Sequence, residues 1–416
     1  MHLKTILNFV EKQKGFVYSR ASWDKTKETI LVTLEPHARS KPVCSGCGKK
    51  RPGYDRLKKR SFQFIPLWNI PVLFLYAMRR VECPTCGIVV ERVPWTDGKH
   101  QSTLSYRIFL AGWAKHLSWK QTAAMLGTSW DTVYRSVTWV VRWGLVNREL
   151  RDIEAIGVDE IQYRRGHKYL TLVYQVDADC RRLLYVAKDR TEDSFRGFFK
   201  ILPETTLAGL KYTCSDMWAN YLKVASEQAG HTIQILDRFH IMKKFNEKIN
   251  EVRAQEAKQL AADGYEPVLK NSRWCLLKRR ENLTDKQTVK LKELLQYNLR
   301  SVRSYLMRED FQRFWEYSST HHAGKFLDQW CVRAMKSKIE PMKAMAKTLR
   351  KHRDLLLNWF EADGKLSSGS VEGMNNKAKL AMKKAFGFKS YKAIEIALYH
   401  QLGKLPEPKS SHRFCG

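Results

Sequence analysis

Three carboxylates in this 416-residue chain stand where an apolar, strand-like segment ends or a helix begins: Asp159 in GVDE, Asp216 in CSDMW and Glu372 in SVEGMNN. Cleavage and transfer of a phosphodiester require an activated oxygen nucleophile and stabilisation of the leaving 3′ oxygen. Two divalent ions roughly 3.5–4 Å apart meet both needs, and hard oxygen ligands suit Mg²⁺. We therefore expect Asp159, Asp216 and Glu372 to hold two Mg²⁺ ions in one catalytic site.

Two neighbouring carboxylates could replace members of this trio. Glu160 follows Asp159 directly, but consecutive side chains of a strand point to opposite faces, so only one of them can face the metals. Asp237 in LDRFH also ends a predicted strand and competes with Asp216 for the second ligand position. The Asp237-x-x-His240 spacing makes both residues accessory candidates, and His240 could brace the site or contact phosphate. We favour Asp216 as the ligand and leave Asp237 as the alternative.

Glu372 opens a predicted helix that continues as GMNNKAKLAMKK. Helical spacing places several polar and basic residues on or near the face of Glu372: Asn375, Asn376, Lys379 and Lys383. We expect Asn376 to assist catalysis and the two lysines to bind DNA. An acid near the positive end of a helix dipole would explain Glu372 alone, but it would not explain the whole Glu-Gly-x-Asn-Asn-Lys run.

Four cysteines have the paired spacing of a metal site: Cys44-x-x-Cys47 and Cys83-x-x-Cys86. Each pair ends in a turn, CSGCG or CPTCG, and two such turns can bring four thiolates onto one tetrahedral ion. We predict one structural Zn²⁺, because protein ligands would fill all four positions. Four buried or redox-active thiols are the alternative.

Residues 104–146 read as three helices in which the central pair has helix-turn-helix features. The required small, apolar and turn positions are filled by Ala123, Leu126, Gly127 and Val133. Ser129 is a plausible N-cap for the second helix of that pair. The outward positions of this helix are then short polar or basic residues suited to a DNA groove: Asp131, Thr132, Arg135 and Ser136. A plain pair of antiparallel helices is the alternative.

From Ala155 the pattern changes to apolar runs and alternation with period two. Three strands are predicted in succession, and alternating helix and strand follow as far as HTIQILD. This is the element order of an α/β ribonuclease-H-like core, in which the first strand lies beside the fourth. Asp159 on the first strand and Asp216 at the end of the fourth would therefore meet.

Residues 241–365 read as long helices rich in lysine and arginine, and we interpret them as an all-helical insertion into that core. Four tryptophans occur in this region: Trp274, Trp315, Trp330 and Trp359. Aromatic residues at helical spacing usually belong to a core, and we expect this of most of them. One of the four could stack on an unpaired base.

The overall composition indicates a polyanionic partner. The chain has 74 Lys and Arg against 42 Asp and Glu, a formal net charge of +32 that runs through the whole sequence. No apolar run reaches the roughly 20 residues of a membrane span, and the opening segment is too charged for a signal peptide. Nine cysteines, an odd number, favour a reducing compartment. We expect a bacterial cytoplasmic protein associated with the nucleoid.

At this length several structural units are expected. The predicted divisions are a lead segment 1–40, a zinc-ribbon-like domain 41–100, a helix-turn-helix domain 101–150, the first part of the core 151–240, the helical insertion 241–365, the core completion with Glu372 366–400, and a tail 401–416.

The order of these motifs resembles the ISL3 (ISL-three) family of bacterial insertion-sequence transposases. The likeness covers nearly the whole chain, and its most specific part is SVEGMNNKAKLAMKKAFGFKSY with Phe386-Gly387-Phe388. The resemblance implies a DDE transposase with a ribonuclease-H-like core and a helical insertion, acting on the inverted repeats of its own element. Carried over, it assigns the acidic triad to Asp159, Asp216 and Glu372, an accessory pair to Asp237 and His240, and a zinc knuckle to the four cysteines.

We therefore expect an enzyme that binds terminal inverted repeats, then cleaves and joins DNA with Mg²⁺. A DNA-binding regulator with an inert acidic cluster, or a structure-specific nuclease of the same fold, are the alternatives. Joining two element ends requires two active sites, so we also expect a homodimer or larger assembly on double-stranded repeat and target DNA.

Overall fold

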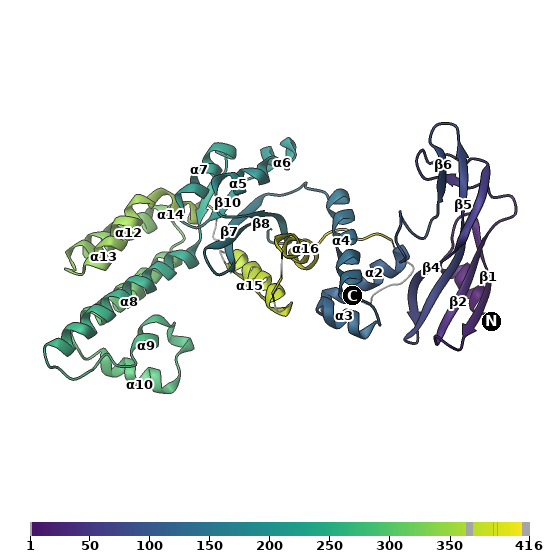
Figure 1. Cartoon of the computed structure of the whole chain (residues 1–416). Helices are drawn as coiled ribbons and strands as arrows, with labels where there is room; N and C mark the ends of the chain where they lie inside the picture. The colour runs from purple at the N-terminus through teal and green to yellow at the C-terminus, as the bar shows by residue number, and fades with distance from the viewer. Residues whose placement is uncertain (1, 363–368, 386, 389, 410–416) are drawn as a thin grey trace. The chain divides into compact units, whose positions relative to one another are not determined.

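The computed structural model describes residues 2–362, 369–385, 387–388 and 390–409, and the side chains of this set apart from those of residues 369 and 370 (Figure 1). The chain divides into two compact units. Unit 1 comprises Met1–Glu149 with Leu380–Gly416, and unit 2 comprises Leu150–Lys379. The second segment of unit 1 includes part of the region that we had predicted to complete the core.

Unit 1 contains a six-stranded sheet with the order β1-β2-β5-β6-β3, in which β4 also pairs with β5. Its elements are α1 (Leu3–Val10), β1 (Phe16–Asp24), β2 (Thr29–Pro36), β3 (Val43–Cys44), β4 (Gly53–Leu67), β5 (Ile70–Cys83) and β6 (Gly87–Arg92). β2 and β5 are parallel, and the other pairs are antiparallel.

The first strands of unit 1 belong to the same sheet as the cysteine-bearing strands. In the TILVTLEP segment, alternate residues Val32 and Leu34 are buried, as the period-two pattern requires. They pack with the aromatic core around Phe16, Tyr76 and Trp95, whose rings meet edge to face. Strands from residues 1–40 and from residues 41–100 therefore share one sheet, because β2 pairs directly with β5.

Unit 1 also holds the three predicted helices, α2 (Leu104–His116), α3 (Trp119–Met125) and α4 (Trp130–Asn147). Gly127 in the turn between α3 and α4 has φ +58°, a conformation that favours glycine. The Ser129 side chain accepts a hydrogen bond from the Thr132 N–H, which confirms Ser129 as the N-cap of α4. Ala123 and Val133 are buried between the helices, as the helix-turn-helix prediction requires.

The C-terminal helix α16 (Tyr391–Leu402) packs on α4 in unit 1. Gly144 on α4 leaves room for the following segment, because a Cβ there would lie 2.8 Å from the Cβ of Leu405. Apolar residues Ile394 and Leu398 are buried. Of the region predicted to complete the core, the part up to Lys379 thus falls in unit 2 and the part from Leu380 in unit 1.

Unit 2 is built on a five-stranded sheet with the order β11-β10-β7-β8-β9. Its strands are β7 (Ala155–Arg164), β8 (Lys168–Val176), β9 (Arg181–Lys188), β10 (Tyr212–Ser215) and β11 (Ile233–Leu236). β7, β8 and β9 are antiparallel neighbours, whereas β10 runs parallel to both β7 and β11. The predicted adjacency of the first and fourth strands is confirmed.

Helices cover both faces of this sheet. One face packs against α5 (Glu192–Phe199) and α7 (Ala219–Gln228). On this face Val158 of β7 belongs to the same buried cluster as Phe195 and Tyr221. The short helix α6 (Glu204–Gly209) lies between α5 and α7 in the sequence. The other face meets α15 (Gly369–Lys384), since a Cβ at Gly157 would lie only 2.4 Å from Val371 Cγ2. Successive residues of β7 therefore face different helices.

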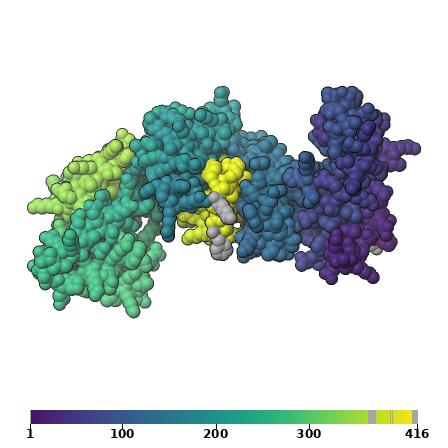
Figure 2. All heavy atoms as spheres, viewed as in Figure 1, coloured from purple at the N-terminus to yellow at the C-terminus, as the bar shows by residue number. Residues whose placement is uncertain are grey.

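The remaining elements of unit 2 are helical from the end of β11 to Glu361. They are α8 (Arg238–Ala262), α9 (Arg273–Leu277), η1 (Arg280–Asn282), α10 (Asp285–Leu294), α11 (Arg300–Gln312), η2 (Arg313–Glu316), α12 (Thr320–Lys336), α13 (Glu340–Lys351) and α14 (Arg353–Glu361). In the space-filling view these green-coloured segments lie together in one mass (Figure 2). The helical character predicted for residues 241–365 agrees with these assignments up to residue 362.

Tryptophans supply much of the core of this helical region. Trp315 and Trp330 are buried together with Phe245 and Phe311, and Trp359 packs against the same cluster. These three residues confirm the interpretation of helical-spaced aromatics as core. Trp274 on α9 differs, because 51 % of it is exposed.

Among the described residues, no helix is both long enough and apolar enough to cross a membrane.

Candidate functional site

Asp159 lies at the centre of the unit 2 sheet and is 7 % exposed. Its Oδ1 accepts a hydrogen bond from the Glu160 N–H at 2.8 Å, and its Oδ2 accepts one from Asn375 Nδ2 at 2.5 Å. The Tyr174 hydroxyl donates to Asn375 Oδ1 at 2.7 Å, so the amide group of Asn375 is oriented with its donor toward Asp159. Both oxygens of the carboxylate are thus held by donors.

The asparagine that contacts Asp159 is not the one that the sequence suggested. Asn375 is buried, whereas Asn376, the predicted accessory residue, is exposed on α15. The two residues differ by about 100° around a helix axis. The packing of Val371 against Gly157 determines which of the two faces the sheet.

Asp216 follows β10, the strand that pairs with β7. Its Oδ1 accepts a hydrogen bond from the Trp218 N–H at 2.9 Å, which fixes the turn into α7. Asp237 follows β11, is buried, and caps α8 by accepting from the Phe239 N–H at 2.7 Å. Asp216 and Asp237 therefore follow the two parallel strands β10 and β11, and β10 is the neighbour of the strand that carries Asp159.

The pKa of Asp159 is raised from 3.8 to about 6, chiefly by burial; His240 and the Glu160 N–H oppose the rise, and the negative charges of Asp216 and Asp237 add to it. A carboxylate that retains two donors despite this cost is suited to binding a cation.

His240 supplies positive charge at the same place. Its Nδ1 lies 3.4 Å from Asp237 Oδ2. Burial alone would lower the pKa of His240, but the Asp237 carboxylate, together with Asp159 and Asp216, raises it to about 9. The structure thus brings both predicted accessory residues, Asp237 and His240, next to Asp159 and Asp216.

Glu160 faces away from Asn375, toward Arg190. Arg190 Nη1 lies 2.9 Å from Glu160 Oε1, and the guanidinium carbon stacks 4.2 Å from the centre of the Trp218 ring. Burial, and then the charges of Asp159 and Asp216, raise the pKa of Glu160 to about 7. Arg190 therefore braces the turn that carries Asp216, a role that no spacing in the sequence indicated.

Glu372 lies one helical turn before Asn375 on α15 and is half-buried. The contact between Asn375 and Asp159 brings its helix to the sheet. Within the part of the chain that the structure describes, Asp159, Asp216 and Glu372 do not approach one another closely enough to form a group with ligand atoms within 4.8 Å. The set of hard oxygen donors nevertheless fits a divalent ion such as Mg²⁺.

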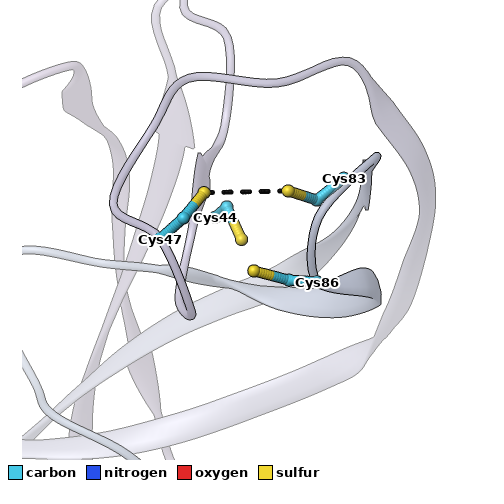
Figure 3. Close-up of side chains that lie close together, drawn as sticks. All are labelled: Cys44, Cys47, Cys83 and Cys86. Atoms are coloured by element: carbon cyan, nitrogen blue, oxygen red, sulfur yellow. Dashed lines mark hydrogen bonds between the residues drawn. The ribbon is translucent and has the colours of Figure 1, made fainter.

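The four cysteines of unit 1 do meet this distance, since their sulfur atoms all lie within 4.8 Å of one another (Figure 3). Cys47 Sγ and Cys83 Sγ are 3.7 Å apart, close to the value of about 3.8 Å expected for two thiolates on one tetrahedral Zn²⁺ at about 2.3 Å. A Cβ at Gly46 would lie 2.8 Å from Cys86 Sγ, so glycine is needed between the first two cysteines. The cluster is compatible with zinc.

The environments of two of the four thiols favour the thiolate, whereas burial and the neighbouring cysteines raise the pKa of Cys86 to about 12. The backbone N–H of Thr85 is the largest influence that lowers the pKa of Cys83, to about 6, and the backbone at Lys49 lowers that of Cys47. Thiolates rather than thiols bind metals. Gly48 and Gly87, which follow the two pairs, have φ of +70° and +71° and close the two turns.

Of the residues predicted to face DNA on α4, one is exposed, two are half-buried and one is buried. Arg135 is exposed and pairs with Asp131 at 2.9 Å, and Asp131 and Thr132 at the start of the helix are half-buried. Ser136 is 1 % exposed and donates to the Thr132 carbonyl at 2.7 Å. The prediction of Ser136 as a DNA contact is wrong, because it lies on the apolar face with Val133 and Val140. Lys379 and Lys383 are exposed on α15.

Comparison with known proteins gives one consistent family. The model of the ISL3 DDE family, described as a transposase, matches residues 156–398. The chain is 27 % identical over 380 residues to the transposase for insertion sequence element IS1001 of Bordetella parapertussis, covering 90 % of this chain and 92 % of the relative. It is 28 % identical over 414 residues to the transposase for IS1557 of Mycobacterium tuberculosis, covering 92 % and 91 %.

Replacement of Asp159 by Asn should stabilise the metal-free protein at pH 8. The folded-state pKa of about 6 exceeds the ordinary 3.8, so ionised Asp159 costs stability as pH rises through this window, by roughly 3 kcal/mol once complete. Thermal unfolding in EDTA should therefore show a higher Tm for Asp159→Asn at pH 8 and no difference at pH 4. Asp179→Asn, at an exposed position, is the control, and a lower Tm for Asp159→Asn at pH 8 would contradict the interpretation.

Replacement of Cys83 by Ser should remove one bound zinc ion per chain, because three thiolates hold Zn²⁺ less tightly than four. Elemental analysis of the purified protein measures this directly. Cys180→Ser, at a cysteine outside the cluster, is the matched control. Equal zinc contents in the two variants, or no zinc in the unmodified protein, would overturn the zinc assignment.

Proposed function

The chain belongs to the ISL3 family of DDE transposases, and from this premise we propose that it binds the terminal inverted repeats of its own insertion sequence and catalyses metal-dependent cleavage and strand transfer there. As a DNA transposase it acts on double-stranded DNA. The hydrogen bond from Asn375 of α15 to Asp159, on the strand that pairs with the one Asp216 follows, is the observation that carries the finer proposal.

We assign unit 2 to a ribonuclease-H-like core interrupted by a helical insertion. The sheet order β11-β10-β7-β8-β9, with three antiparallel strands followed by two parallel ones, supports this assignment. The insertion begins with α8, directly after Asp237, and ends before α15. This arrangement lets two residues far apart in sequence, Asp159 and Glu372, serve one site.

The proposed catalytic carboxylates are Asp159, Asp216 and Glu372, which would hold two Mg²⁺ ions. When bound, such ions activate the attacking oxygen and stabilise the leaving 3′ oxygen. Asp216 is favoured over Asp237 as the second ligand because β10, not β11, is the neighbour of β7. Asp237 caps α8 with one oxygen and holds His240 with the other.

The chain's own residues prepare this site in three ways. Asn375 and the Glu160 N–H orient the Asp159 carboxylate. The Trp218 N–H orients Asp216. His240, positively charged at neutral pH because its pKa is raised to about 9, is placed to attract a phosphate group toward the carboxylates.

DNA recognition is assigned to the exposed side of α4 and to the basic end of α15. Thr132 and Arg135 lie at the start of α4, where residues of a recognition helix contact base edges. Lys379 and Lys383 on α15 would contact phosphates close to the catalytic residues. A Zn²⁺ ion held by the four cysteines would have a structural role, because it would fix the turns at Cys44–Cys47 and Cys83–Cys86 on the unit 1 sheet.

Two further features follow from the proposed reaction. Joining two transposon ends requires two active sites, so we propose a homodimer or larger assembly on DNA. Because the substrate is chromosomal, we place the protein on the bacterial nucleoid.

Glu372→Gln should abolish both nicked and joined products when the protein is incubated with Mg²⁺ and a labelled duplex that carries the terminal repeats flanking its gene. The substitution removes a metal-binding charge and leaves the helix intact. Glu361→Gln, at an exposed glutamate of unit 2, should retain both products.

The alternatives give different results in the same assay. Cleavage without joining by the unmodified protein would indicate a nuclease. Repeat binding with no cleavage would indicate a regulator. Unchanged activity of Glu372→Gln would remove Glu372 from the catalytic set.

Asn375→Ala should slow cleavage roughly 10- to 100-fold, the usual cost of losing a residue that orients a metal ligand, whereas Asn376→Ala should change it less than threefold. The two residues are adjacent and chemically identical, but only Asn375 contacts Asp159. Initial rates at saturating DNA over a Mg²⁺ titration measure the effect, and Asn375→Ala should also require more Mg²⁺. A larger effect at Asn376 would show that the helix is oriented differently.

A further inference from the structure

The first half of β4 lacks the alternation of buried and exposed side chains that is usual in a sheet strand. Residues 53–59 are all exposed, whereas the second half of the strand buries Phe62 and Phe64 in alternation. The pairing with β5 is irregular in the exposed half, with register shifts between Gly53 and Arg56 and between Arg56 and Lys59. This half of β4 is therefore an edge strand that projects both its faces into solvent.

The same segment and the residues just before it carry a concentration of positive charge without ion-pair partners. Its exposed basic residues are Lys49, Lys50, Arg56, Lys58 and Lys59, and together with the intervening residues 49–60 they are called the basic ribbon. Within the part of the chain that the structure describes, none of these five forms an ion pair. Asp55, the one acidic residue of the ribbon, is already paired with Arg80 at 2.7 Å.

Some exposed lysines elsewhere on the surface have acidic partners. Lys211 pairs with Glu154 at 2.7 Å, and Lys248 pairs with Glu251 at 2.9 Å. Like charges that lie close together repel one another. Five basic side chains without ion-pair partners therefore destabilise the free protein through charge repulsion, and a bound polyanion would neutralise them.

The basic residues of this strand could instead protect the sheet edge, which is a simpler explanation than DNA binding. Edge strands often carry a lysine or an inward charge that prevents pairing with another chain. One or two charges of either sign suffice for that purpose. Five basic residues, with the only acid neutralised, exceed what edge protection requires.

The dimensions of the ribbon match duplex DNA. Residues 53–60 of an extended strand span about 26 Å, the axial length of about seven to eight base pairs. Two-stranded ribbons also fit the major groove, which is about 12 Å wide. The ribbon lies in the same unit as α4, because the Thr103 N–H donates to the Gln63 carbonyl at 2.9 Å and Trp139 Nε1 donates to Asp97 at 2.9 Å.

We propose that the basic ribbon is a second DNA-binding surface of unit 1, which contacts phosphates of duplex DNA independently of base sequence. The proposal rests on the proposed function in taking duplex DNA as the partner. It assigns to the ribbon the affinity for any duplex and leaves the selection of the terminal repeat to α4.

The test compares a triple variant, Arg56→Gln with Lys58→Gln and Lys59→Gln, with a control that changes the same charge elsewhere in unit 1, Lys12→Gln with Lys25→Gln and Lys27→Gln. The control lysines are exposed and lie outside β4. Fluorescence anisotropy measures affinity for a terminal-repeat duplex and a scrambled duplex over a range of salt concentrations. Zinc content and Tm establish that each variant is folded.

The slope of log affinity against log salt should fall by about 2 to 3 in the ribbon variant, since each lost phosphate contact changes it by about 0.9. Affinity for both duplexes should fall at least tenfold at 100 mM salt, and the control should match the unmodified protein. Arg135→Ala should instead lower affinity for the terminal repeat alone. If the triple variant does not fold, Lys58→Gln should lower the slope by about 0.9.

Equal slopes of log affinity against log salt in the ribbon variant and the control would overturn the proposal. Aggregation of the ribbon variant with unchanged DNA binding would also overturn it, because that result would indicate edge protection. A cleavage assay at saturating protein distinguishes failure of the ribbon proposal from failure of the proposed enzymatic function. Cleavage with an unchanged slope means that the ribbon assignment fails and the function stands. A reduced slope in a protein that never cleaves means that the ribbon assignment stands and the catalytic proposal fails.

Discussion

The contact between α15 and the centre of the unit 2 sheet is the constraint on which the proposed site depends. Gly157 leaves room for Val371 where any Cβ would collide with it. Two residues further along β7, the same face presents Asp159 to Asn375. A helix that follows the long helical insertion is thereby held against the first strand of the sheet, and Glu372 is carried with it.

The buried hydrogen bonds at this contact form a chain from Tyr174 through Asn375 to Asp159. A buried carboxylate without partners would be protonated or would destabilise the fold. Here its orientation is maintained by neutral donors that add no charge, so the negative charge remains available for a cation. On the opposite face of β7, Arg190 forms an ion pair with Glu160 and stacks on the Trp218 ring in the turn before α7. The site is thus braced from both faces of one strand.

Much of this arrangement could be predicted from the sequence, because it follows from local pattern. Period-two alternation and apolar runs predicted the five strands, and the element order typical of a ribonuclease-H-like core predicted that the first strand lies beside the fourth. The spacing of cysteines predicted the cluster at Cys44, Cys47, Cys83 and Cys86. The N-cap at Ser129 followed from side-chain chemistry. The assignment of α16 to unit 1 could not be predicted, since it depends on Gly144 accommodating Leu405 from a distant part of the chain.

The errors at the level of single residues have one physical origin. Helical spacing gives relative positions around an axis but does not determine which face packs, so Asn376 was expected where Asn375 lies. Ser136 was assigned to solvent although it lies three residues after buried Val133 and four before buried Val140, a spacing that indicates the apolar face. Arg190 could not be identified, because its role arises only when β9 and the turn before α7 come together.

The most direct test of the central claim is anomalous diffraction from Mn²⁺ in crystals of the protein bound to terminal-repeat DNA. The account predicts manganese ligated by Asp159, Asp216 and Glu372, with Asn375 still bonded to Asp159 and Asp237 bonded to His240. Manganese bound by Asp237 in place of Asp216, or a site that excludes Glu372, would contradict it.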